Sequence, residues 1–178
     1  MTKSQSIESI EKATGRSWDE WNKFFADNNA KELDHKSVAS LVHKELEGKI
    51  DSAGWWSQAI TVAYEQYIGR REPGQKSDGT YEVSVSKTVE GTRDEVYASY
   101  AEKLSQAKQF NNLTTDNERT STTPVRSYWK CDFSDGSKII WSFEQKNPGK
   151  VLLVAMHTGL ASSESAVKWR DFWKEYLD

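Results

Sequence analysis

The stretch VRSYWKCDFSDGSKIIWSFEQKNPGKVLLVAMHT, residues 125–158, contains three runs whose side chains favour strands. In the first two runs apolar residues alternate with polar ones, which is typical of strands with one buried face. The third run, 151–158, is apolar on both faces, and we expect it to be the most covered strand. Residues 134–136 and 147–149 have the composition of tight turns. The stretch therefore predicts an antiparallel meander.

Alternation also predicts which side chains share the buried face of the first two strands. These are Val125, Trp129, Cys131, Phe133, Ile139, Trp141 and Phe143. A helix that begins at Ser162 or Ser163 is expected next. Its apolar side chains recur at helical spacing and are Ala166, Trp169, Trp173, Tyr176 and Leu177. A sheet with one apolar face needs a cover, and this helix is the expected cover.

The chain before the meander predicts a further strand and a further helix. Alternation from Tyr81 to Val85 indicates a half-buried strand. Thr92 and Glu95 have the spacing of a capping box, which opens a helix. Residues 111–124 are polar and rich in Ser, Thr and Asn, and we expect either an edge strand or a mobile segment there.

The first third of the chain predicts three helices. Ser17 and Glu20 form a second capping box, a helix begins at Asp34, and another runs from about Ser52 to a cap at Gly69. The fold class is therefore α+β. The expected parts are a helical domain (1–69), a linker rich in polar residues, Pro and Gly (70–79), and a domain of sheet and helix (80–178).

Composition and charge exclude several classes of protein. Aromatic residues make up 12% of the chain and include eight tryptophans, so a sizeable core is expected. The 24 basic and 27 acidic residues leave no basic excess, which argues against a nucleic-acid partner. Residues 1–12 lack the apolar stretch of a signal peptide, and no apolar run is long enough for a membrane span. With a single cysteine, Cys131, we expect a cytoplasmic protein.

Three stretches of the second domain resemble the SRPBCC superfamily, also called START-like or helix-grip. They are YEVSVSKTVEGTRDEVY (81–97), KIIWSFE (138–144) and MHTGLASSESAVKWRDFWKEYLD (156–178). Within the superfamily they resemble proteins related to the activator of the Hsp-ninety ATPase. The resemblance implies a short helix-grip domain, in which an antiparallel sheet wraps around a long C-terminal helix. Residues 8–69 resemble a small helical domain of unknown function that precedes such modules in bacterial proteins.

Aromatic residues are the strongest candidates for a site. In the helix-grip fold that the resemblance implies, the space between sheet and helix holds either a ligand or a solid core. The residues that would line it are Tyr100, Trp129, Trp141, Phe143, His157, Trp169, Phe172 and Trp173. The sequence leaves both alternatives open.

Other chemistry finds little support in the sequence. His157 lies at the end of an expected strand and either acts as a general base or bonds a turn and positions the last helix. Cys131 is expected to be an inert core residue. His35 and His43 are about 12 Å apart along one helix, which is too far to share a metal ion, so we expect solvated side chains. No nucleotide-binding motif is present in the sequence, and neither a cofactor nor a metal is expected.

The residues support three functional hypotheses. The first is a non-enzymatic protein that binds a small apolar ligand or a protein partner through the second domain. The second is an enzyme of the cyclase or hydrolase type, with His157 as its base. The third is a protein-interaction or co-chaperone-like module, which predicts an exposed apolar patch on residues 17–69.

Overall fold

The computed structural model describes residues 6–177 and has an α+β fold. The chain divides into two compact units, one ending at Gly79 and the other beginning at Thr80. We call them the helical unit and the sheet unit. Residues 1–5, part of the segment considered for a signal peptide, and Asp178 lie outside the described residues. Within residues 6–177, no helix has the length and apolar character needed to cross a membrane.

The described part of the helical unit contains one α-helix and one 3-10 helix more than the sequence predicts. Its elements are α1 (Ile7–Thr14), α2 (Trp18–Asp27), the 3-10 helix η1 (Ala30–Glu32), α3 (His35–Leu46) and α4 (Ala53–Tyr67). The additional α-helix is α1, and it buries only Ile10 fully. The helix is short, and its caps Ser6 and Gly15 define its two ends.

The other α-helices form where predicted; side-chain caps begin α2 and α3, whereas α4 begins after Ser52 without one. Ser17 and Glu20 complete the capping box of α2, and Asp34 caps α3 by accepting from the amide of Ser37. Trp21 and Phe25 of α2 are fully buried. The ring of Phe25 stacks on that of Tyr64 with centroids 3.9 Å apart, which joins α2 to α4.

Two arginines of the expected linker bond back to the helical unit. Arg70 donates to the backbone carbonyls of Lys31 and Leu33. The Nη2 of Arg71 lies 2.9 Å from Oε2 of Glu65, a side chain that is almost fully buried in α4. The chain therefore stays attached to the helical unit as far as Arg71.

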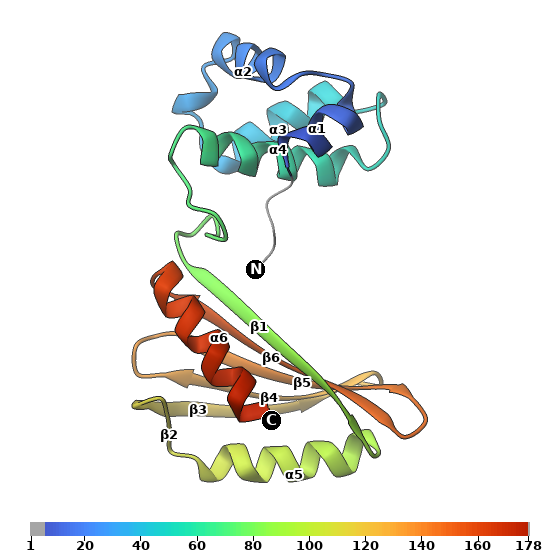
Figure 1. Ribbon diagram of the computed structural model, residues 1–178, viewed down its shortest axis with the longest axis vertical. Coiled ribbons are helices and arrows are strands. Elements are labelled where there is room, and N and C mark those ends of the chain that lie inside the picture. The colour runs from blue at the N-terminus through green and yellow to red at the C-terminus, as the bar shows by residue number, and fades with distance from the viewer. Residues whose placement is uncertain (1–5, 178) are drawn as a thin grey trace. The chain divides into compact units, whose positions relative to one another are not determined.

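The sheet unit contains six antiparallel strands and two helices (Figure 1). The strands are β1 (Tyr81–Glu90), β2 (Gln109–Phe110), β3 (Leu113–Thr122), β4 (Arg126–Phe133), β5 (Lys138–Asn147) and β6 (Lys150–Leu160). The helices are α5 (Arg93–Gln106) and α6 (Ser163–Leu177). The strand order is β1-β6-β5-β4-β3-β2, and the curled sheet with its C-terminal helix is compatible with a helix-grip fold.

One face of the sheet is buried and the other is partly exposed. Buried and half-buried positions alternate along β4 and β5, as the sequence predicts, and also along β6, where cover on both faces was expected. Both helices cover the buried face, because Val96 and Leu104 of α5 and Trp169 and Trp173 of α6 belong to the same core. Strand β6, which lies between β1 and β5, is fully covered on this face only, and its Leu152, Val154 and Met156 are half-buried on the other.

Two details of the sheet were not settled by the sequence. Residues 113–122 form strand β3, so the edge-strand alternative is the correct one and the mobile-segment alternative is wrong. Pairing with β4 gives this polar segment its strand conformation. Val125 was expected on the buried face, but it precedes β4 and is 60% exposed. Alternation does not extend across the turn that precedes the strand.

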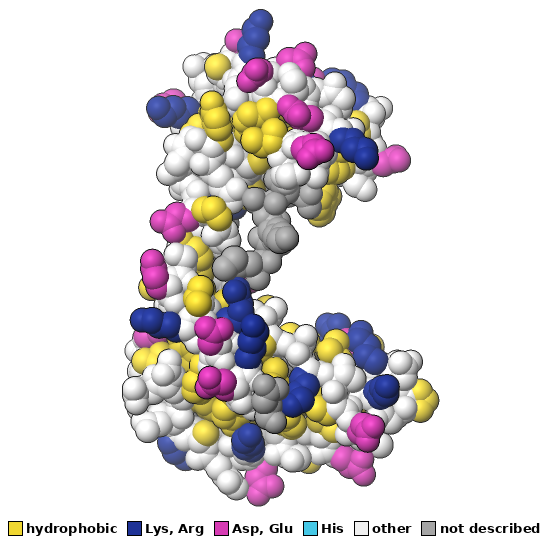
Figure 2. All heavy atoms as spheres, viewed as in Figure 1, with side chains coloured by type: hydrophobic (Ala, Val, Ile, Leu, Met, Phe, Trp, Pro, Cys, Tyr) yellow, Lys and Arg dark blue, Asp and Glu magenta, His cyan; other side chains and the backbone are white. Residues whose placement is uncertain are grey.

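Surface charge is mixed in both units. On the face shown in Figure 2, Lys and Arg side chains lie among Asp and Glu side chains in each unit. This matches the near balance of basic and acidic residues in the sequence.

Candidate functional site

The eight candidate site residues lie together in the core of the sheet unit. The cross-strand register places Trp129 of β4 opposite Trp141 of β5, and Trp141 opposite Ala155 of β6. In the same way Ile139 lies opposite His157. The buried stripe of α6 supplies Trp169 and Trp173, Phe172 packs beside them, and α5 supplies Tyr100.

Ring contacts link all of these side chains except Trp129 into one aromatic cluster. The centroid of Trp141 lies 5.8 Å from that of Tyr100 and 5.8 Å from that of Trp173. Trp173 continues the cluster to Trp169 at 5.5 Å and to Phe172 at 4.9 Å. Such distances are those of directly packed aromatic pairs. The candidate residues thus pack on one another between the sheet and the helices.

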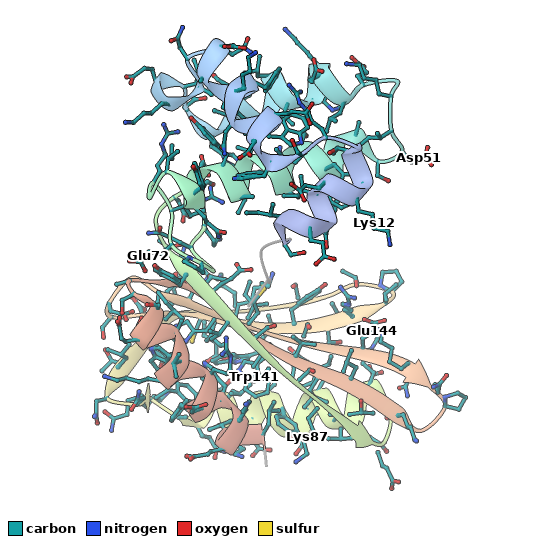
Figure 3. The ribbon with its side chains drawn as sticks, turned by 45° about the horizontal axis from the view of Figure 1, so that its top comes forward. Lys12, Asp51, Glu72, Lys87, Trp141 and Glu144 are labelled. Carbon is teal, nitrogen blue, oxygen red and sulfur yellow. The ribbon has the colours of Figure 1, made fainter. Side chains whose placement is uncertain are left out.

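Trp141 differs from its neighbours in hydrogen bonding. Trp129 donates its indole N–H to Oγ of Ser105, and Trp173 donates to Nδ1 of His157, both at 3.1 Å. Trp141 is fully buried, and its Nε1 has no partner among the described residues. Figure 3 shows its place inside the unit. One strong donor in the middle of the cluster is therefore unpaired.

His157 lies in the middle of a series of hydrogen bonds in which each side chain donates to the next. An indole N–H can only donate, so Nδ1 of His157 accepts from Trp173. The other nitrogen, Nε2, therefore carries the proton and donates to Oγ of Ser137, 2.8 Å away. Ser137 in turn donates to Oδ1 of Asp135 at 2.6 Å. The series joins α6 to the turn between β4 and β5.

The hydrogen bonds of His157 fit the second role considered for it, in which it bonds a turn and positions the last helix. The side chain is fully buried, and burial lowers its pKa to about 4 although the charge of Asp135 opposes the shift. Both nitrogens are occupied, and a second proton on Nδ1 would face the N–H of Trp173. His157 therefore holds the turn and the last helix in place, and it offers no free nitrogen to a substrate.

Two further side chains of the sheet unit have structural roles. Cys131 is fully buried, and burial together with Asp132 and Glu118 raises the pKa of its thiol to about 12, so it is inert as predicted. Lys87 on β1 donates to the carbonyl oxygen of Leu177 at 2.6 Å, at the C-terminal end of α6 (Figure 3). A cation there is favoured by the helix dipole.

Several contacts of the site were missed by sequence reasoning. Ser137 shares parity with Ile139 and Trp141, and this signal could have placed it on the buried face beside His157. Phe110, next to the polar segment, packs its ring 5.4 Å from Trp173. A single aromatic residue before a polar run carries no periodic signal, so nothing in the sequence marked it.

The helical unit contains no metal site among its described residues, but its histidines are not simply solvated. Nδ1 of His35 lies 3.1 Å from Oε2 of Glu65, and Nε2 lies 3.1 Å from Oε1 of Gln58. His43 has a buried Nδ1 without a hydrogen-bond partner. Throughout residues 6–177, no group of three His, Cys, Asp or Glu side chains is placed to hold a metal ion.

The comparisons with known proteins find no matching family model, no matching curated protein and no matching solved structure.

Proposed function

We propose that the sheet unit binds a small, largely apolar ligand with one hydrogen-bond acceptor, and that the protein is not an enzyme. The observation that carries the proposal is the buried, unpaired Nε1 of Trp141. Leaving such a group unpaired costs about 1–3 kcal/mol. Native proteins usually pair buried donors with protein, water or ligand. A ligand acceptor beside Trp141 would remove this cost.

Two tyrosines offer a route to Trp141. Tyr100 of α5 and Tyr176 of α6 are half-buried, and their ring centroids lie 5.8 and 5.9 Å from that of Trp141. Burial raises the pKa of Tyr176, and the nearby Tyr100 phenol adds to the rise. In the proposal, rotation of these two side chains admits the ligand. The aromatic walls would favour a flat or alicyclic ligand whose acceptor is a carbonyl or ether oxygen.

The hydrogen bonds of His157 support a binding role over catalysis. A cyclase or hydrolase that uses this site needs a base with an available nitrogen. Trp173 and Ser137 occupy both nitrogens of His157. The same contacts fix α6 against the sheet.

We also propose that the sheet unit belongs with the SRPBCC, or START-like, proteins and that the chain acts in the cytoplasm of a bacterium. The six-stranded curled sheet and the C-terminal helix support the first part, together with the sequence motifs at 81–97, 138–144 and 156–178. The free, buried thiol of Cys131 is compatible with a reducing compartment. The ATPase-activating function of the heat-shock relatives is not part of the proposal.

Native mass spectrometry of the freshly purified protein, with a denatured sample as control, tests the proposal directly. We expect extra mass that leaves on denaturation. In a second experiment, indole N–H resonances are followed by NMR while the flat, uncharged ketone 2-acetylnaphthalene is added as a probe. The resonance of Trp141, assigned with Trp141→Phe, should shift most.

A matched control is Trp56→Phe, which changes a half-buried tryptophan of the helical unit. Probe affinity should fall in Trp141→Phe and should not change in Trp56→Phe. A bare native mass together with a Trp141 resonance that the probe does not move would refute the proposed function.

A further inference from the structure

A groove of about 590 Å³ lies between α3 and α4 in the helical unit. Ala39 of α3 and Ser57 of α4, which are 4% and 2% exposed, form its floor. Because both side chains are small, the two helices leave an open channel above their contact. The groove shares no residue with the aromatic cluster of the sheet unit, so its role is independent of the function proposed for that unit.

Two parallel rows of α3 side chains form one wall of the groove. The inner row is His35, Ala39 and His43, and the outer row is Lys36, Ser40 and Lys44. In each row the residues are four apart, so they lie above one another on one helix face. Each row has a small residue in the middle and a nitrogen-bearing side chain at each end. The wall is therefore low in the middle and has a positively charged lysine, Lys36 or Lys44, at each end.

The charge of the groove is opposite in sign to that of the chain. Lys36 and Lys44 are exposed, and Glu47 is the one acidic residue among the groove's lining residues. The whole chain carries a net charge of −3. In addition, the buried Nδ1 of His43 has no partner among the described residues. Charge complementarity therefore favours an anionic occupant.

The openness of the groove favours an elongated occupant. Six of its ten lining residues are exposed, including Ser40, Gly54 and Gln58. A compact small molecule would stay largely in solvent there, whereas binding sites for small molecules usually enclose most of the ligand. Lys36 and Lys44 are separated by eight residues of helix, which is about 12 Å. A second helix with acidic residues at the same spacing could contact both lysines.

We infer that the α3–α4 groove docks an acidic, amphipathic helical segment of a protein partner. Two carboxylates of the segment, eight residues apart, pair with Lys36 and Lys44. An apolar side chain midway between them lies over Ala39 and Ser57. Docking of this kind is a common mode of peptide recognition. His35, held by Glu65 and Gln58, forms a fixed end to the groove.

The test uses the full chain and a fluorescein-labelled alanine-based helical peptide, with two glutamates eight residues apart and a leucine midway. Fluorescence anisotropy measures binding, and amide NMR locates it. We expect saturable binding that weakens with salt, with the largest shifts on α3 and α4. The double variant Lys36→Glu/Lys44→Glu should bind at least about tenfold more weakly. Ser40→Trp should also weaken binding, because the side chain would fill an exposed part of the groove.

Two controls separate this site from general charge effects. Lys12→Glu reverses an exposed lysine on α1, outside the groove, and should leave the affinity unchanged. A peptide with lysines in place of the glutamates should not bind. Absence of binding, equal affinity for the Lys36→Glu/Lys44→Glu variant, or shifts outside α3 and α4 would overturn the inference. If dodecanoate shifts the groove amides and the peptide does not, a small amphipathic anion is the occupant and the inference is wrong.

Discussion

Acidification should destabilise the protein through His157 before most carboxylates titrate. In the unfolded chain this histidine takes up a proton near its ordinary pKa of 6.5, whereas in the folded protein its pKa is lowered to about 4. Between these two values the unfolded state binds more protons than the folded state. The free energy of unfolding therefore falls as the pH is lowered through this window, and it is insensitive to His157 above it.

The size of the effect depends on the width of the window. Each pH unit between the two pKa values is worth about 1.4 kcal/mol, so the loss between pH 6.5 and pH 4 approaches about 3 kcal/mol. Urea unfolding followed by tryptophan fluorescence, at a series of pH values from neutral to about 4, measures it. In the folded protein, two features disfavour a second proton on Nδ1 of His157: the side chain is fully buried, and Nδ1 accepts a hydrogen bond from Trp173.

The variant His157→Gln isolates the contribution of this residue. Glutamine has one acceptor group, its carbonyl oxygen, and one donor group, its NH₂, so it can accept and donate as neutral histidine does. It does not titrate in this range. Carboxylates such as Asp132, whose pKa is held low by hydrogen bonds from Arg119 and Asn117, change with pH in both proteins and cancel in the difference. Parallel stability curves for the two proteins, or a His157 pKa near 6.5 by NMR, would refute the reasoning.

Three further predictions concern single side chains. Lys87→Met should lower the free energy of unfolding by about 1–2 kcal/mol and speed hydrogen exchange at the end of α6, because it removes the bond to Leu177; unchanged exchange would contradict this role. Glu65→Gln should cost about 3 kcal/mol by thermal denaturation, because it leaves Arg71 without its buried partner; a loss within error would show that the pair is not structural. Cys131 should resist alkylation by iodoacetamide at pH 8 until the protein unfolds, and rapid labelling of the native protein would show that the thiol is accessible.

Local chemistry made much of the fold predictable. The capping boxes at Ser17 and Thr92 each depend on residues three positions apart, so the sequence alone shows them. Alternation assigned Trp129 and Trp141 to the buried face because strand geometry leaves only two faces. The same alternation brought the candidate residues of the sheet into one cluster.

Features that depend on distant parts of the chain could not be predicted in this way. The hydrogen bonds from Trp173 to His157 and from His157 to Ser137 join a helix, a strand and a turn. No local sequence pattern indicates which donor bonds which acceptor. His35 meets Glu65 across 30 residues for the same reason. Helix α1 was missed because it has only eight residues and one fully buried side chain, although Ile7 and Ile10 have helical spacing.

The polar composition of β3 has a consequence for how the protein avoids aggregation. Strand β2 and the preceding Lys108 pair with β3 only as far as Thr115, so no strand of the described residues covers the outer edge of β3 beyond it. An edge of this kind is a template for the strands of other molecules. Here the pairing with β4 shifts register between Asp116 and Arg119, and Asn117 is in the left-handed region at φ 54°. The kink and the charges beside it make a poor template for amyloid-like stacking.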